Sequence, residues 1–340
     1  LDAVGYMSRA AFLMDKVMSR AGLEGRAFVA MLSSFACAIP GIMATRTIPS
    51  AKDRIATMLS APLATCSARL PVYVLLVGIL VPAGSSLGPV SVRGLVLFGM
   101  YLLGALSAML AARVVKKITD RSGTLLPFYM EMPPYRIPTP RSVGMAMWEP
   151  TKAFLRKAGT IIMGATIVIW ALTTFPLRSD AEMTAAGVDP SDEVAATAYN
   201  MEHSAAAKVG KAIEPVFAPQ GFDWRVNISL IGSMAAREVA VSTLGQVASA
   251  SDPEDDVSVS ESVQKWTYTD GPHQGEKVFT PDTTIAMLIF FAFALQCVAT
   301  IGILKRESGG WKWPAIAFGY MFVLAWVGSS LAAVITRAVM

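Results

Sequence analysis

The sequence predicts an all-α polytopic membrane protein with two broken or re-entrant helical segments that form a possible pseudo-repeat. Hydrophobic residues make up 54% of the 340-residue chain and charged residues only 16%, whereas soluble domains carry about 25% charge. Several apolar segments approach or exceed the ~20 residues that span a bilayer. Two of these segments contain proline or glycine in their interior, and this feature predicts that their helices are interrupted.

Composition also limits the classes of function. The net charge of +4 is small and gives no indication of a nucleic-acid partner. The pattern GxxxxGK(S/T) of nucleotide-binding P-loops does not occur. The HExxH, GxGD and DDxxD patterns of intramembrane enzymes are also absent, so we expect no catalytic residues. The chain starts at Leu1 without a signal-peptide pattern, and we expect that an N-terminal part is missing.

The first broken region is predicted at residues 28–81. Pro40 and Gly41 interrupt its apolar run just after Cys37. Because proline has no N–H group, the carbonyl of Ala36 should lose its helical partner. In hydrocarbon such a break persists only inside protein or against water. A thiol beside a freed carbonyl indicates an ion site; the alternative is a proline-kinked packing helix with an inert cysteine.

The same region contains a second proline and a second cysteine. Pro62 should free the carbonyl of Met58. Cys66 follows Pro62 by four residues, so both are expected on one helix face. Residues 1–27, which precede this region, are predicted to contain the end of a membrane helix and an interfacial helix.

The middle of the chain, residues 90–175, is predicted to contain core spans at 90–115 and 158–175. A basic loop at 113–157 joins them, and the positive-inside rule places this loop in the cytoplasm. Its second half, residues 142–157, is typical of an amphipathic interfacial helix.

The second half of the chain alternates polar loops with apolar segments. It divides into an acidic external loop (178–211), a second broken region (212–250), an acidic polar loop (251–282) and C-terminal spans (283–340). The loop charges favour a re-entrant course for 224–250, but acidic residues contribute little to the positive-inside rule. A full crossing of the membrane therefore stays open.

The two broken segments share the pattern G-x-M-A-x-R. It runs from Gly41 to Arg46 in the first segment and from Gly232 to Arg237 in the second. Paired interrupted segments in two halves of a chain point to the binding site of a transporter. A match of six residues between apolar segments can also arise by chance.

Arg237 and Glu238 place two charges inside an apolar segment. Either charge costs ~2.5–3.5 kcal/mol at the centre of a bilayer, and intramembrane charges are by default functional. Adjacent helical residues do not face each other, so we expect Glu238 to face a pathway and Arg237 to cap carbonyls at a break. The alternative is that both charges pair structurally with other helices.

Sulfur-containing side chains are the candidate soft ligands. The chain has three cysteines, Cys37, Cys66 and Cys297, all in apolar segments and without CxxC or zinc-finger spacing. They are either core filler or one polarizable cluster. Most methionines are expected to be core filler, whereas Met43 and Met234 are candidate ligands because they belong to the repeated pattern.

Seven long stretches carry a family resemblance: GYMSRAAFLMD, SSFACAIPGIMATRTI, APLATCSARLPVY, MEMPPYRIPT, AIEPVFAPQGFDWR, GSMAAREVAVSTLG and FALQCVAT. In this order, and over nearly the whole chain, they resemble the membrane region of FeoB, the family of bacterial ferrous iron transporters. The resemblance implies two Gate motifs, around residues 37–69 and 232–245. It also implies that Cys37, Cys66 and Cys297 line the path of the ion.

The resemblance further implies a role and partners. Fe²⁺ would be the transported substrate, in a multi-pass protein of the bacterial cytoplasmic membrane and its lipid bilayer. An N-terminal GTPase domain, which this chain lacks, would use GTP and Mg²⁺. A small cytoplasmic FeoA-like partner and a homo-oligomer are also implied. The candidate structural or gating residues are Pro40, Gly41, Arg46, Pro62, Gly232 and Arg237.

Two other functions stay open. One is a Gate-type transporter of another divalent metal, Mn²⁺ or Zn²⁺, or of a nucleoside-like solute. A solute carrier would need hydrogen-bonding side chains at the breaks rather than three cysteines. The other is a purely structural membrane subunit, against which the charges of Arg237 and Glu238 argue.

Overall fold

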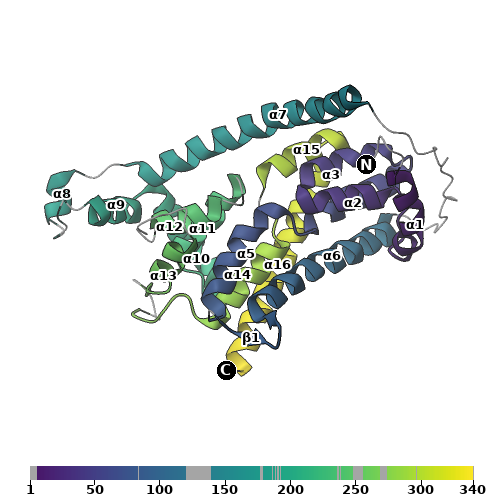
Figure 1. Cartoon of the computed structure of the whole chain (residues 1–340). Coiled ribbons are helices and arrows are strands. Elements are labelled where there is room, and N and C mark those ends of the chain that lie inside the picture. The colour runs from purple at the N-terminus through teal and green to yellow at the C-terminus, as the bar shows by residue number, and fades with distance from the viewer. Residues whose placement is uncertain are drawn as a thin grey trace. The chain divides into compact units, whose positions relative to one another are not determined.

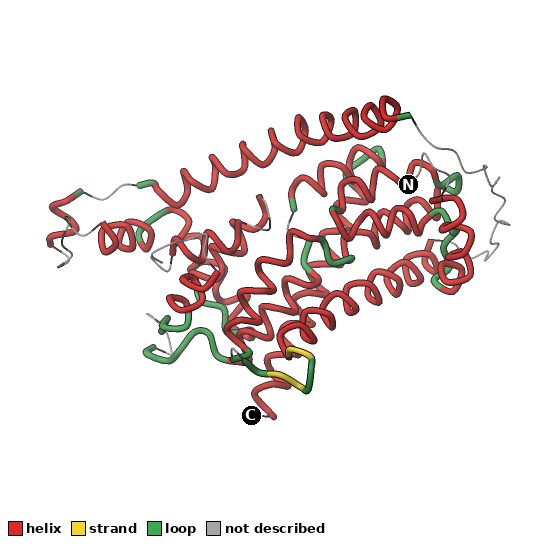
Figure 2. Tube along the Cα trace, in the orientation of Figure 1, coloured by secondary structure: helices red, strands yellow, loops and turns green. Residues whose placement is uncertain are grey.

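The structure is a computed structural model, and its described residues are helical almost throughout (Figure 2). It describes residues 6–82, 84–119, 139–176, 179–185, 187, 189, 191, 193–235, 237, 239–247, 256–268, 274–295 and 297–339. Within these ranges, the only sheet is a hairpin of β1 (Ser86–Leu87) and β2 (Val90–Ser91). The predicted all-α class is confirmed. Glu238 and much of the predicted basic loop 113–157 lie outside the described residues.

The chain forms two compact units. The first comprises Leu1–Ser67, Met100–Ile161 and Ala299–Met321, and the second comprises Ala68–Gly99, Ile162–Val298 and Phe322–Met340. Each unit is described by itself below.

The first unit is built around a short helical hairpin. Its N-terminal elements are α1 (Tyr6–Arg20), α2 (Ala27–Ala36), α3 (Ala38–Ala44), the 3₁₀ turn η2 (Thr45–Thr47), α4 (Ala51–Ser60) and the 3₁₀ turn η3 (Ala61–Leu63). Helices α2 and α3 pack against each other, and α1 packs on α2 (Figure 1). Ser50 caps α4, because its side chain accepts a hydrogen bond from the Asp53 N–H across 3.3 Å.

The second unit contains another short helical hairpin. It includes η4 (Ser67–Arg69, shared with the first unit), α5 (Leu70–Leu80), α10 (Ala205–Phe217), η5 (Ala218–Gln220), α11 (Trp224–Ala235), α12 (Val239–Val247), α13 (Asp256–Val263) and α14 (Pro281–Phe293). Helix α5 packs against α12, α13 and α14. An aromatic cluster supports this core, with Phe290 edge-on to Phe217, Phe222 and Phe322 at centroid distances of 5.6, 6.0 and 6.4 Å.

Six further helices lie in the described residues. They are α6 (Val92–Thr119), α7 (Pro140–Thr174), α8 (Asp180–Ala185), α9 (Glu193–Glu202), α15 (Val298–Ser308) and α16 (Lys312–Val339). Three of them, α6, α7 and α16, are the longest. Helix α6 covers most of the helix predicted at 90–115. Residues 142–157 and 158–174, which were predicted as an interfacial helix and a separate span, form one continuous helix of 35 residues, Pro140–Thr174. Gly159, at the junction, does not end the helix.

Four stretches of the described residues are long and apolar enough to cross a membrane. They are Ala51–Leu80, Val92–Thr119, Pro281–Ser308 and Lys312–Val339. The first and third are not continuous helices, because non-helical residues separate α4 from α5 and α14 from α15. A span with such interruptions leaves backbone groups unpaired unless protein or water satisfies them.

Helix α6 shows how an unbroken span is divided between protein and lipid. Its buried residues recur every fourth position and include Met100, Gly104, Ala108 and Ala112. Large apolar side chains on the opposite face, among them Leu102, Leu106 and Leu110, are about half exposed or more. Residues four apart share one helix face, so α6 has one protein-facing side and one side suited to lipid.

Candidate functional site

The first break in a membrane segment lies at Cys37 itself. Helix α2 ends at Ala36, Cys37 is extended with φ −158° and ψ 138°, and α3 begins at Ala38. Pro40 lies in the first turn of α3, where helical N–H groups have no partner within the helix. The chain leaves the helix at Cys37, three residues before Pro40, and the Ala36 carbonyl is the one whose helical partner would have been the missing N–H of Pro40.

The second break extends from Ala61 to Arg69. Pro62 lies in η3, and the chain becomes extended at Ala64, with φ −57° and ψ 134°. Cys66 follows in a non-helical stretch before η4 and α5. The prediction that Pro62 and Cys66 share one helix face is wrong, because no helix connects them.

One hydrogen bond connects these two breaks. The Ser67 Oγ donates to the backbone carbonyl of Ala36 across 2.9 Å. The carbonyl that α2 leaves without a helical partner is thus bonded to the residue after Cys66. The neighbours of Cys37 and Cys66 are therefore in direct contact, and both cysteines are partly exposed.

Helix α6 contacts the chain at Thr65, the residue before Cys66. The Thr65 Oγ1 lies 3.4 Å from the carbonyl of Met100, within donating distance. A Cβ atom on Gly104 would lie 2.2 Å from that hydroxyl, so only glycine allows α6 to approach this closely. Thr65 is fully buried, and the extended stretch before Cys66 is held by this contact.

The glycines of the repeated pattern lie where the arms of each hairpin cross. A Cβ atom on Gly41 would lie 1.9 Å from the Ser34 Oγ and 2.8 Å from the Ala30 carbonyl of α2. A Cβ atom on Gly232 would lie 2.8 Å from the Thr243 Oγ1 of α12. The two motifs nevertheless occupy different arms, since Gly41 lies on the second arm of its hairpin and Gly232 on the first. The pseudo-repeat therefore stays a prediction.

The second hairpin begins at a buried aspartate. The Asp223 carboxylate accepts hydrogen bonds from the Arg225 N–H at 2.6 Å and the Val226 N–H at 3.1 Å, and so caps α11. Burial raises the pKa of Asp223 above its usual value, although Arg225 opposes the shift. Helix α11 has 12 residues and spans ~18 Å, well short of the ~30 Å of hydrocarbon. The Ser229 Oγ donates to the Ala240 carbonyl of α12 across 3.0 Å, which closes the hairpin.

A third break lies between α14 and α15. Helix α14 ends at Phe293, Ala294 is extended, and Cys297 directly precedes α15. The Nη2 of Arg237, which lies in the turn between α11 and α12, donates to the carbonyl of Ala294 across 2.8 Å. Arg237 is only 5% exposed. It joins the second hairpin to the break before Cys297.

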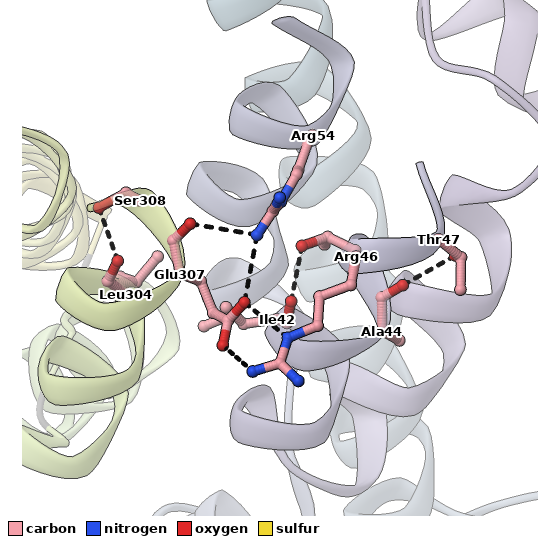
Figure 3. A network of polar contacts seen from close by, with 9 residues as sticks. Ile42, Ala44, Arg46, Thr47, Arg54, Leu304, Glu307 and Ser308 are labelled. Atoms are coloured by element: carbon pink, nitrogen blue, oxygen red, sulfur yellow. Dashed lines mark hydrogen bonds and ion pairs between the residues drawn. The ribbon is translucent and has the colours of Figure 1, made fainter. Parts of the chain in front are cut away.

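Arg46, which ends the first motif, binds a carboxylate instead of a carbonyl. It lies in η2 and reaches Glu307 near the end of α15 (Figure 3). The two motif methionines, Met43 and Met234, are both half-buried.

The cysteines are divided between the units. Cys37 and Cys66 belong to the first unit and Cys297 to the second. None of the three, all within the described residues, forms a disulfide. Across the described part of the chain, no three His, Cys, Asp or Glu side chains form a group that could hold a metal ion. In the described part of the chain, each break therefore places one thiol near backbone carbonyls.

Sequence reasoning did not single out several polar residues around the breaks. Ser67 was indistinguishable from the other small residues near Cys66. Arg69 is fully buried, and Lys116 Nζ lies 2.6 Å from Asp53 Oδ1 in a mostly buried pair. The charges of Arg69, Lys116 and Asp53, which lie inside or at the ends of apolar runs, could have identified these three residues, as the charge of Arg237 identified that residue.

The fold and these breaks define a class: a polytopic α-helical membrane protein whose membrane helices are interrupted at three cysteines. The Gate family, described as "Nucleoside recognition", matches residues 1–80 and 155–311. The family "Ferrous iron transport protein B C terminus" matches residues 97–149. The chain therefore belongs to the Gate family and corresponds to the membrane region of FeoB proteins.

Named relatives agree with this assignment. The Fe(2+) transport protein A/Fe(2+) transporter FeoB fusion protein of Porphyromonas gingivalis is 42% identical over 97% of this chain and 40% of its own length. Fe(2+) transporter FeoB of Leptospira interrogans is 40% identical over 96% of this chain and 45% of its own. The Helicobacter pylori protein of the same name is 34% identical over 98% of this chain and 52% of its own. The chain thus spans about half the length of these relatives. No solved structure matches it.

Proposed function

We propose that this chain forms the membrane permease part of a GTP-dependent Fe²⁺ uptake transporter, with the ion passing the breaks at Cys37, Cys66 and Cys297. The observation that carries the proposal is the Ser67–Ala36 hydrogen bond, which joins the residues beside two of the three thiols. The names of the relatives, which describe Fe(2+) transporters, support the choice of substrate.

The chemistry of the breaks suits a transported soft-biased cation. Fe²⁺ accepts sulfur, nitrogen and oxygen ligands, and thiolates favour it over Mg²⁺ or Ca²⁺. A transport site must bind loosely enough to release its ion. Isolated thiols with nearby carbonyls meet this requirement better than a closed four-ligand cage would. Glu238, Met43 and Met234 are proposed as secondary ligands along the same path.

The whole protein is proposed to extend beyond this chain. An N-terminal GTPase domain would use GTP and Mg²⁺ to drive the cycle, in a multi-pass protein of the bacterial cytoplasmic membrane. The name of the Porphyromonas relative, a fusion of Fe(2+) transport protein A with FeoB, supports an FeoA-like partner. A homo-oligomer is proposed from the family resemblance alone.

A second candidate function follows from the description of the Gate family, which names nucleosides. Binding of a nucleoside would not require thiols, but it would require several hydrogen-bonding groups that converge on the ligand. Transport of Mn²⁺ or Zn²⁺ would use the same thiols as Fe²⁺. Competition experiments therefore separate nucleosides from metal ions, since only metal ions should compete through the cysteines.

The test is Fe²⁺ uptake by the full-length protein in proteoliposomes. Replacing Cys37, Cys66 and Cys297 together by serine should reduce uptake at least about tenfold, with yield and melting temperature unchanged, because a hydroxyl is a poor substitute for a thiolate ligand. A nucleoside such as uridine should not compete in the unaltered protein, whereas Mn²⁺ or Zn²⁺ can. Unchanged uptake in the triple variant would remove the thiols from the ion path.

A further inference from the structure

The turn between α15 and α16 lies where two apolar stretches end. Pro281–Ser308 and Lys312–Val339 are both long and apolar enough to cross a membrane, so we expect the residues between them at the membrane surface. Gly309, with φ +74°, reverses the chain there. The Ser308 Oγ donates to the carbonyl of Leu304 across 2.6 Å and closes the last turn of α15. A short turn therefore separates two stretches of membrane length.

This turn carries exposed positive charge. Lys305, Arg306 and Lys312 are all exposed. Glu307 is the only acidic residue in the segment 299–321, and its side chain is only 4% exposed. Two arginines, themselves 49% and 31% exposed, bind its carboxylate (Figure 3). The single negative charge is therefore buried and neutralised, whereas the positive charges face outward.

Helix dipoles account for only part of this charge. Lys305 and Arg306 lie in the last turn of α15, where the negative partial charge of the helix end favours cations. Lys312 is the first residue of α16, where the partial charge is positive and a cation is disfavoured. Its Nζ lies 5.4 Å from the centroid of the Trp313 ring, a contact that contributes little at an exposed site. An external anion would stabilise Lys312 where its own helix does not.

An exposed tryptophan accompanies these cations. Trp311 is 62% exposed, and the Lys305 Nζ lies 4.2 Å from the centroid of its ring, within the range of a cation–π contact. Tryptophan is enriched at membrane surfaces because its ring is apolar and its N–H group is polar. Further along α16, Ile316 and Phe318 are 42% and 36% exposed. An apolar surface suited to acyl chains thus follows directly after the cations and the ring.

We propose that the turn between α15 and α16 binds the headgroup of an anionic phospholipid, through Lys305, Arg306 and Lys312, with Trp311 beside the upper part of the acyl chains. A phospholipid complements both the positive charge and the apolar surface that follows it. A soluble anion complements the charge alone. The basic residues indicate the cytoplasmic side of the membrane, and anionic lipids attract basic segments at such a surface. The inference does not depend on which ion is transported.

The experiment measures which lipid lies beside Trp311, without using iron. Full-length protein is reconstituted in phosphatidylcholine vesicles that contain a minor share of phosphatidylglycerol. In each sample only one of the two lipids carries brominated acyl chains, which quench tryptophan fluorescence. The contribution of Trp311 is the signal that Trp311→Phe loses. Phosphatidylglycerol should lie beside Trp311 about tenfold more often than its share of the lipid predicts, since each cation near the surface attracts its headgroup several-fold.

The test variant replaces the three basic residues of the turn by glutamine. The preference should then fall to within about twofold of the share of phosphatidylglycerol in the vesicle. The matched control removes the same net charge, again with glutamine, from three exposed lysines of the second unit: Lys208, Lys265 and Lys277. The control should keep the preference of the parent, because these lysines are remote in sequence from the turn.

Three results would overturn the proposal. The first is an unaltered protein in which Trp311 shows no preference for phosphatidylglycerol. The second is an equal preference in the test variant and the control, because the charge of the turn would then have no specific effect. The third is a Trp311 that neither lipid quenches, because another protein segment would then cover the turn. No transport is measured, so each result is distinct from a failure of the uptake test.

Discussion

The Ser67 hydroxyl donates to the carbonyl oxygen of Ala36 across 2.9 Å, although the two residues are 31 positions apart. The bond pairs a carbonyl at one helix break with a side chain at the next break. The bond thereby links the break at Cys37 to the break that contains Cys66. A carbonyl without a helical partner needs another donor inside a membrane. Here the donor is Ser67, so the residue after Cys66 contacts the residue before Cys37.

Ser67→Ala should therefore weaken transport more than it weakens the fold. The lost hydrogen bond is worth about 0.5–1.5 kcal/mol, which corresponds to a reduction in Fe²⁺ uptake of up to about tenfold with little change in melting temperature. The matched control is Ser85→Ala, since the Ser85 Oγ also donates to an exposed carbonyl, that of Pro82, at 3.0 Å. Equal uptake by both variants would show that the bond does not shape the path.

The crossing glycines predict a stability effect. Gly41→Ala would place a Cβ atom against the backbone carbonyl of Ala30, which cannot rotate away, and Gly232→Ala would place one against Thr243. Overpacking of this kind costs about 1–3 kcal/mol, with the larger loss at Gly41. Gly94→Ala in α6 meets no atom within 4 Å and should stabilise by about 0.5–1 kcal/mol. Melting temperatures in detergent measure the three variants, and a Gly41→Ala protein as stable as Gly94→Ala would contradict the crossing.

Arg237→Gln should impair both stability and transport. It removes a donor from the buried Ala294 carbonyl, at a cost of about 1–3 kcal/mol. Arg93 provides the comparison, because it also donates to backbone carbonyls, those of Val81 at 2.8 Å and Gly78 at 3.3 Å, at the end of α5 instead of at a break that contains a cysteine. Arg93→Gln should lower the melting temperature while Fe²⁺ uptake per folded molecule is kept. If both variants lose uptake equally, Arg237 has no special role at the Cys297 break.

Glu238 is a prediction from sequence, and its side chain lies outside the described residues. Glu238→Ala should reduce Fe²⁺ uptake strongly, because carboxylates inside membrane segments are costly and usually functional. Glu261→Ala, at an exposed position of α13, should have little effect. Similar uptake by the two variants, measured at equal expression, would remove Glu238 from the pathway.

Local sequence patterns predicted the helices and the existence of the breaks. Apolar length and the absence of internal proline indicated the helix that is α6, and the charge of Arg237 singled out a residue that lies between α11 and α12. The position of Pro40 indicated which carbonyl would lack a helical partner, that of Ala36, because proline has no N–H to donate. It did not predict that the chain becomes extended at Cys37 and enters a new helix at Ala38.

Contacts between residues far apart in the sequence could not be predicted from local sequence patterns. Glu307 binds Arg46 from 261 positions away, and nothing in the basic loop that contains Glu307 distinguishes it from an ordinary surface acid. The Ser67–Ala36 bond depends in the same way on how two hairpin arms meet. The candidate thiols could be named from the sequence, but their supporting contacts required the fold.

The most direct measurement is the iron K-edge X-ray absorption spectrum of the full-length protein loaded with Fe²⁺ under reducing conditions. If the ion rests beside the joined breaks, sulfur should appear in the first coordination shell at about 2.3 Å, the length of zinc–thiolate bonds. This scatterer should be lost when Cys37 and Cys66 are replaced by serine. A first shell of oxygen and nitrogen alone in the unaltered protein would contradict a cysteine-lined path.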